Sequence, residues 1–490
     1  MIPLLRPRRA PAGRLAGFLC VFCLLASPAF ADLGSETARR LEEEARAALA
    51  SSEAAPAALS RPVFDYGGWT QARYLDYRND DKDASSPDPV DYALWLDTRL
   101  WFKAVFRPAV AVERAASPPG EREASPPGER YRYSLYLRLK NLYTDSHPAA
   151  TAGGSDNDGP HVDYAYAHAD LAPWRVRAGR QYFSVGQGIA YSDVDDGVLV
   201  FFNAAPWDLR AFWSRTLPHE DNVDTSVPGF DKGGDRRFYG LEADYGGWAG
   251  QTLYAFGVWQ RDHSEERPAD AAQGYRYDSA YAGVGARGVL KKTVAYWWES
   301  VHETGRDYLS GTNTRADIDA WAHVAAVSYA PEVRGRPSFY FKAAYASGDA
   351  DRVSVTDTVN GNTAGKDTNF LYFGYLPTGY AFAPRLSNIY FLKAGASCAP
   401  FEKSRRFEKL TVAVDYYKYF KTKAAGGVYD PQATQADTDL GAEIDVTASW
   451  GIFSDLFLSL QYGRFMPGGA FPAATDDNED YLSVSVSLSF

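Results

Sequence analysis

Arginine and lysine residues occupy alternate positions in several segments whose other residues are largely apolar. Arg99 and Lys103 lie in one such segment, Arg138 and Lys140 in another, and Arg177 in a third. Because side chains alternate between the two faces of a β-strand, the cations of each segment would lie on one face. The planar guanidinium group of arginine matches carboxylates through paired hydrogen bonds. The pattern therefore predicts a basic track that binds an anionic solute.

Acidic residues share these polar faces and support a second interpretation. Asp97 alternates with Arg99, and Asp163, Glu443 and Asp445 occupy the polar faces of other segments. These carboxylates would orient some of the arginines through paired hydrogen bonds. In the second interpretation, the paired charges only keep the wall of a channel hydrated and stable. The sequence alone leaves both interpretations open.

Catalytic and metal-binding motifs are weak in this sequence. Gly283–Gly288 fits G-x-G-x-x-G but lies in an alternating strand pattern without a following helix. The 7 histidines show no zinc-ligand spacing, and no G-x-S-x-G motif occurs. Residues 193–197 and 156–159 resemble calcium loops but lack the closing glutamate, so solvated loops are favoured and loop-bound Ca²⁺ stays open. We predict no enzyme activity and no cofactor, and a barrel hydrolase is the least favoured class.

The elements that carry these residues are predicted to be membrane-spanning β-strands. Apolar and polar residues alternate from Val90 to Phe106, from Arg132 to Leu142 and from Tyr481 to Phe490 at the C-terminus. A tilted strand of about 9–11 residues crosses a bilayer. The terminal phenylalanine, the aromatic strand ends and the 15% aromatic content favour a membrane barrel over a soluble sandwich. We predict an all-β fold, a transmembrane antiparallel β-barrel of about 18 strands of the outer-membrane porin type.

The N-terminus has the features of a secretory leader. Basic residues precede an apolar run from Leu15 to Ala26, and Ala29-Phe30-Ala31 provides a cleavage site. We predict a signal peptide over residues 1–31 that is cleaved after Ala31. Residues 32–62 are predicted to form a short periplasmic helical arm, because good helix formers are concentrated there. Residues 63–490 would form the barrel, in an outer membrane of the Gram-negative type.

Charge and cysteine content narrow the range of partners and compartments. The chain has 62 acidic and 51 basic residues, which argues against nucleic acid or an anionic membrane surface as a partner. Removal of the leader would leave Cys398 as the one cysteine, so no intramolecular disulfide is expected in the mature chain.

Several short motifs together resemble the alginate export family of outer-membrane barrels. The matching motifs follow one another in the order and with the spacing of the family. They are Asp97-Thr-Arg99 with Trp101, Val162-Asp-Tyr-Ala165, Gly179-Arg-Gln181, Leu386-Ser-Asn388, Asp439-Leu-Gly-Ala-Glu-Ile-Asp445 and Tyr462-Gly-Arg-Phe-Met-Pro-Gly468. The resemblance extends over most of residues 63–490.

The resemblance implies a function and a set of site residues. It implies an 18-stranded barrel that exports an anionic uronate polymer by passive, electrostatically assisted passage, with Arg99 and Arg180 as cations of the constriction. Asp193 and Asp195 would lie on the loop after the Gly-Arg-Gln strand, and Arg385 lies near a family arginine without matching its register. Tyr182 stands where the family has an arginine, so another acidic polysaccharide or a smaller anion stays open as substrate. The alternative function is a general or anion-selective porin, and outer-membrane lipid and a periplasmic export scaffold are the further expected partners.

Overall fold

The structure is a computed structural model that describes residues 62–85, 88, 91–106, 131–147, 153–217, 235–264, 276–356 and 361–490. The predicted leader and the predicted helical arm up to residue 61 lie outside the described residues. The described part of the chain contains no α-helix, and therefore no helix that could span a membrane.

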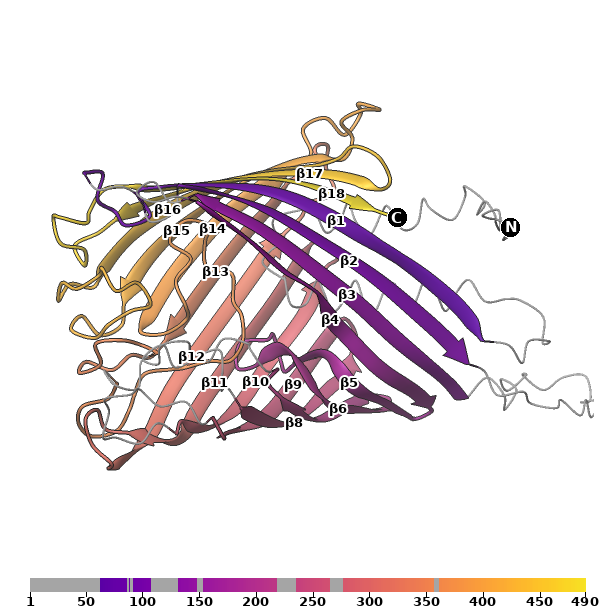
Figure 1. The fold of residues 1–490 in the computed structure, drawn as a ribbon, viewed down its shortest axis with the longest axis horizontal. Coiled ribbons are helices and arrows are strands. Elements are labelled where there is room, and N and C mark those ends of the chain that lie inside the picture. Colours follow the sequence, from indigo (N-terminus) through magenta and orange to yellow (C-terminus); the bar gives the residue numbers. More distant parts are fainter. Residues whose placement is uncertain are drawn as a thin grey trace, which may run out of the picture.

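The described residues form 18 β-strands. Their bounds are β1 Val63–Arg78, β2 Tyr92–Phe106, β3 Tyr131–His147, β4 Gly154–Leu171, β5 Trp174–Ser184, β6 Ser192–Ala204, β7 Trp207–Arg215, β8 Arg236–Trp248, β9 Gln251–Asp262, β10 Asp278–Leu290, β11 Val294–Tyr308, β12 Arg315–Tyr329, β13 Ser338–Ala346, β14 Ile389–Cys398, β15 Leu410–Lys421, β16 Asp439–Gly451, β17 Leu456–Pro467 and β18 Glu479–Ser489. Each strand pairs antiparallel with the next, and β18 pairs with β1 to close the barrel (Figure 1). The predicted fold class and strand number are confirmed.

Glycine makes the closure of the barrel possible at the C-terminus. The amide of Gly68 in β1 donates to the carbonyl oxygen of Phe490 at 2.9 Å, and the amide of Phe490 donates back to Gly68 at 3.0 Å. A Cβ atom at Gly68 would lie 2.5 Å from the carbonyl oxygen of Arg99 and 2.9 Å from the Phe490 ring. Phe490 therefore completes the pairing of β18 with β1 opposite Gly68, where any larger residue would require the neighbouring atoms to move.

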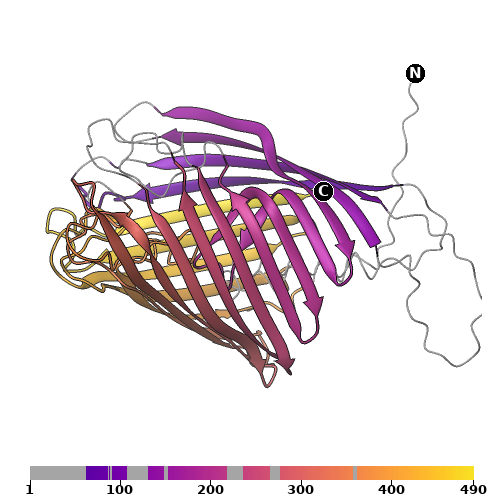
Figure 2. The ribbon, with the colours of Figure 1, turned by 90° about the horizontal axis from the view of Figure 1, so that it is seen from below.

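The two ends of the barrel differ in the length of their connections. Several connections after even-numbered strands are short, as at residues 172–173, 205–206 and 249–250, whereas those at 107–130 and 399–409 are longer, and β18 also ends at this end of the barrel. We call this the turn end. The connections after odd-numbered strands include the longest described ones, 347–388 and 422–438, and the described parts of these connections lie at the opposite end, which we call the loop end (Figure 2).

The outward face of the barrel is apolar, as the alternation predicted. On β2, Leu94, Leu96, Leu100 and Phe102 are exposed large hydrophobic residues, whereas Asp97 and Arg99 face the interior. This arrangement reverses that of a soluble sandwich, because here the apolar face would contact lipid.

Two segments of the loop end fold into the barrel and build a core there. Residues 185–191 connect β5 to β6, and residues 347–356 and 361–388 are the described parts of the connection from β13 to β14, which we call the segment 347–388. The segments hydrogen-bond to each other, since the amide of Phe373 donates to Ala190 and that of Tyr375 donates to Gly188. Their apolar side chains pack against inward residues of the wall such as Ile318 and Val324 of β12. The inward face of β12 is therefore apolar, although most inward faces are polar.

Candidate functional site

The lumen-facing side of β1–β4 differs from the rest of the interior. On β8–β16, inward side chains are almost fully buried against the two inward segments, as Phe238, Glu299, Tyr340 and Phe391 illustrate. On β2–β4, the inward charged side chains stay half-buried, with 23% exposure for the Arg99 side chain and 16% for that of Arg138. Accessible charge in the interior is thus concentrated along β2–β4, where a solute in the lumen would meet it.

Arg99, Arg138 and two aspartates form one charge cluster on this wall. Arg99 donates from Nε to Asp97 Oδ1 at 3.0 Å and from Nη1 to Asp163 Oδ2 at 3.0 Å. Arg138 donates from Nε to the same Asp163 oxygen at 2.5 Å. The structure therefore brings together two of the cations that the alternation predicted, and it pairs them with the predicted aspartates. The carboxylates fix the guanidinium planes while part of each remains accessible.

A β-bulge in β4 places Asp163 at the centre of the cluster. Arg138 lies opposite Tyr164 and the next residue, Leu139, lies opposite Val162, so Asp163 is an extra residue without a partner in β3. A bulged residue is released from the regular alternation and aims its side chain differently. Here the bulge directs one carboxylate to arginines of two strands.

Aromatic side chains that were not among the predicted site residues are interleaved with the cations. The Trp69 ring centroid lies 5.4 Å from Cζ of both Arg99 and Arg138, and the Tyr164 ring lies 3.8 Å from Cζ of Arg138. Toward the turn end, Trp101, Tyr136 and Tyr166 form a stacked row across β2, β3 and β4, with centroid distances of 6.4 and 5.2 Å. The sequence contains one indication of these aromatic residues, because they occupy the same alternating strand positions as the basic residues.

The remaining predicted cations of β2, β3 and β5 border this cluster. Lys140 lies opposite Arg99, and no acidic side chain of the described residues forms an ion pair with it. Lys103 lies nearer the turn end, opposite Asp65 and Tyr136. Arg177 of β5 is buried, and its guanidinium lies 5.6 Å from the Tyr166 ring. Lys103, Arg138, Lys140 and Arg177 thus border one side of the lumen together with Arg99.

Arg180 does not share the lumen face with Arg177. In β5, Arg177 and Gln181 are buried toward the interior, whereas Arg180 follows Ala178 on the opposite face. Arg180 pairs with Asp196 through Nε at 3.0 Å, and its Nη1 donates to the carbonyl oxygen of Val162 at 2.9 Å. This register separates Arg180 from the cluster, in contrast to the constriction role that the resemblance implied.

The predicted aspartates of the following segment lie in a strand instead of a loop. Asp193 and Asp195 both belong to β6. Asp195 is 1% exposed and accepts hydrogen bonds from the hydroxyls of Tyr191 at 2.6 Å and Ser214 at 2.9 Å. Asp195 therefore holds the inward segment 185–191 and the wall together, and residues 193–197 form part of β6 where a solvated loop was favoured.

One further predicted cation lies away from the accessible wall. Arg385 belongs to the inward segment 347–388, and its guanidinium lies 5.5 Å from the Tyr372 ring and 5.8 Å from the Tyr429 ring.

Buried glutamates of the wall anchor the inward segments. Glu242, Glu299 and Glu303 were not among the predicted site residues, and Glu443, which was expected to orient arginines, binds backbone amides. Glu242 accepts from the amide of Gly186, Glu299 from that of Gln187 and Glu303 from that of Leu371, at 2.7–2.9 Å. Glu443 accepts from the amides of three successive residues, 380–382, at 2.6, 2.8 and 3.2 Å. These carboxylates satisfy backbone donors that would otherwise be buried without partners.

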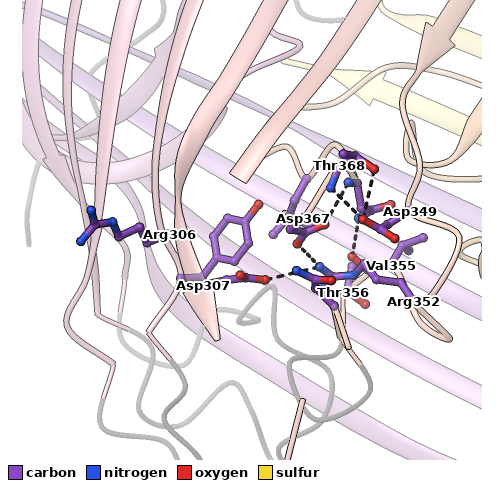
Figure 3. Close-up of polar contacts among 12 residues, drawn as sticks. Arg306, Asp307, Asp349, Arg352, Val355, Thr356, Asp367 and Thr368 are labelled. Atoms are coloured by element: carbon purple, nitrogen blue, oxygen red, sulfur yellow. Dashed lines mark hydrogen bonds and ion pairs between the residues drawn. The ribbon is translucent and has the colours of Figure 1, made fainter. Parts of the chain in front are cut away.

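An ion-pair cluster fixes the longer inward segment to the wall (Figure 3). Arg352 lies between Asp367 of the same segment and Asp307 of β11, and its exposure is 3%. Burial alone would lower the pKa of Arg352, but Asp367 and Asp307 raise it above its ordinary value. Nearby, Asp349 accepts from the amide and hydroxyl of Thr368 at 2.9 and 3.1 Å. The ion pairs of Arg352 and the hydrogen bonds of Asp349 therefore tie this segment to β11 and to itself.

Comparisons with known proteins agree with the fold and with the motifs. The family described as "Alginate export" matches residues 119–485. No curated protein matches the chain. Among solved structures, OccK5 (OpdH) of Pseudomonas aeruginosa is 12% identical, with a TM-score of 0.50 over 87% of this chain and 98% of that one. OpdK of Pseudomonas aeruginosa, solved with vanillate, gives the same identity, TM-score and coverage. At this identity the likeness concerns the fold alone.

Proposed function

Since this chain belongs to the alginate export family and forms an outer-membrane channel, we propose that it exports an anionic polysaccharide by passive passage. The polymer would move along the lumen face of β1–β5, beside the cluster of Arg99, Arg138, Asp97 and Asp163. We expect no covalent change to the polymer during passage.

The observation that carries the proposal is the interleaving of cations and aromatic rings on one wall. A uronate polymer presents a carboxylate on each sugar and a C–H face on each ring. Arg99, Arg138 and Lys140 would attract the carboxylates, and rings such as Trp101 and Tyr136 would stack on the sugar faces. A track with several weak contacts of both kinds favours movement over tight binding, because each contact can be exchanged for the next.

A general or anion-selective porin for small solutes is the second candidate function. It is favoured by the ion pairs of Arg99 and Arg138 with Asp97 and Asp163, because these reduce the net positive charge that a polymer would meet. The two inward segments also occupy much of the interior along β8–β16.

Single-channel conductance in a planar bilayer tests the proposal. We expect preference for anions and blockage of the current when uronate oligomers are added. Both effects should weaken in Arg99→Ala and in Trp101→Ala, whereas Arg405→Ala in the exposed connection before β15 serves as the matched control. Blockage that is lost in Arg99→Ala but kept in Trp101→Ala would favour the small-anion porin. Cation preference without blockage would contradict both anion-based functions.

A further inference from the structure

A row of arginines runs across the outer surface of the barrel at the loop end. Arg215 of β7 lies directly opposite Arg237 of β8, which lies opposite Arg261 of β9. Their neighbours Ser214, Arg236 and Gln260 are buried toward the interior, so the row itself faces outward. Arg306 of β11 continues it beyond Asp278 of β10. We call Arg215, Arg237, Arg261 and Arg306 the outer arginine row.

A row of large aromatic residues lies directly beneath the first three arginines. Trp213 precedes Arg215 by two positions, Tyr239 follows Arg237 by two, and Trp259 precedes Arg261 by two. The three aromatic residues therefore lie on the same outward face as the arginines, nearer the centre of the barrel wall. Their exposed fractions are 41%, 45% and 50%. Tryptophan and tyrosine gather where the hydrocarbon of a membrane meets its headgroups. The outer arginine row therefore lies at the level of the lipid headgroups.

The row ends in a hollow of the outer surface. A cavity of about 710 Å³ spans the loop ends of β9–β12, and it is lined by Arg261, Arg306 and Arg315, by Lys366 and by three aspartates. Aspartates pair with most of these cations, since Arg315 lies 3.2 Å from Asp278, Lys366 lies 3.2 Å from Asp319 and Arg306 lies 3.4 Å from Asp317. In the row itself, Asp235 lies 2.9 Å from Arg215 and 3.4 Å from Arg237. Most of these side chains stay partly or largely exposed, with about two-thirds exposure for both Arg306 and Asp317. No acidic side chain of the described residues forms an ion pair with Arg261. Exposed pairs of this kind contribute little and exchange readily for a stronger partner.

We propose that the outer arginine row and its cavity bind the phosphate groups of a phosphorylated glycolipid in the outer leaflet. The guanidinium fork matches phosphate oxygens through two parallel hydrogen bonds. Several arginines at one depth suit a headgroup with more than one phosphate, and the aromatic row beneath contacts its acyl chains. The whole chain is acidic, so the local surface departs from the net charge. A free phosphate ion would gain nothing from the aromatic row, and the lipid is therefore the favoured source of phosphate.

Native mass spectrometry of the mature barrel in detergent tests this proposal, with bisphosphorylated hexa-acyl lipid A as the probe. We expect the variant Arg237→Gln/Arg261→Gln/Arg306→Gln to retain at least about tenfold less lipid than the unchanged protein, from the loss of three surface charges. The matched control is Lys291→Gln/Lys292→Gln/Arg405→Gln at the turn end, which should bind normally. A heat-dependent shift in gel mobility confirms folding of each variant. If the triple variant does not fold, Arg261→Glu provides the test, because Arg261 is exposed and outside the ion pairs described.

Three results would overturn the proposal. The first is equal retention of lipid A by the unchanged protein and by the folded arginine variant. The second is equal retention of dephosphorylated lipid A, which would mean that the acyl chains alone bind. The third is full displacement of lipid A by millimolar inorganic phosphate, which would mean that the site takes the free ion. Retention of lipid A by the Arg→Lys triple variant at an intermediate level would support recognition of phosphate by the guanidinium fork.

Discussion

Arg99 and Arg138 share a single oxygen of Asp163, at 3.0 and 2.5 Å, although the two arginines lie on different strands. One carboxylate therefore holds two like charges together on the wall of the lumen. This sharing determines how much positive charge the channel offers to a passing anion, because each arginine keeps only part of its charge uncompensated.

Replacement of Asp163 by asparagine should make the channel more selective for anions. The change removes one negative charge and leaves Arg99 and Arg138 less compensated, so the ratio of anion to cation permeability should rise by about two- to fivefold at low salt. Reversal potentials in a salt gradient measure this ratio. Asp317→Asn, on the exposed outer surface, is the control. A ratio that stays unchanged in Asp163→Asn would show that the cluster lies off the ion path.

Replacement of Glu443 should release the longer inward segment. Glu443 is fully buried and accepts from three successive amides and from the Tyr419 hydroxyl. In Glu443→Ala these donors lose their partner, at a cost of about 1–3 kcal/mol for each buried donor left without one. We expect a lower unfolding temperature and a larger, fluctuating conductance. Glu443→Gln keeps one acceptor oxygen, so its unfolding temperature and conductance should lie between those of the unchanged protein and Glu443→Ala. Identical current traces for all three proteins would contradict an anchoring role.

Substitution of Gly68 should impair closure of the barrel. A Cβ atom there meets the Phe490 ring and the carbonyl oxygen of Arg99 at less than 3.0 Å. We expect Gly68→Ala to reduce the fraction of folded, heat-shiftable barrel recovered from membranes, because β1 and β18 no longer approach closely. Gly154→Ala at the start of β4 is the control, since no atom lies within 4 Å of its added Cβ. Equal recovery of both variants would show that the seam tolerates widening.

The sequence predicted the barrel because alternation is a local property. The faces of β2 follow directly from the order of Asp97, Arg99 and Trp101, and the strand number follows from repetition of that pattern. The bulge at Asp163 and the buried anchor Glu443 did not follow, because both depend on partners far away in the chain. The resemblance placed Arg180 at the constriction, but the register of β5 directs it to the other face. The inward segments were missed because polar composition alone does not reveal a loop that folds into a barrel.

Lys82 should tie the first loop-end connection to the β15–β16 connection and to the start of β18 in a pH-dependent manner. Its Nζ lies 2.8 Å from Asp430 and 3.0 Å from Glu479, and its exposure is 3%. Burial alone would lower the pKa of Lys82, but Glu479 and Asp430 raise it above its ordinary value. A raised pKa in the folded state means that the stabilisation is complete below the ordinary lysine pKa of about 10.4 and is lost as pH rises through the raised value.

Lys82→Met removes the charge and leaves two carboxylates uncompensated, at a cost of about 3–5 kcal/mol. Cleavage by endoproteinase Asp-N at Asp80, Asp81 or Asp83 should therefore be faster in Lys82→Met at pH 8. The free energy of unfolding, measured in denaturant, should be lower in Lys82→Met than in the unchanged protein by a constant amount from pH 8 to pH 10. Above pH 10 the difference between the two proteins should become smaller. A difference that grows with pH would contradict the ion-pair account.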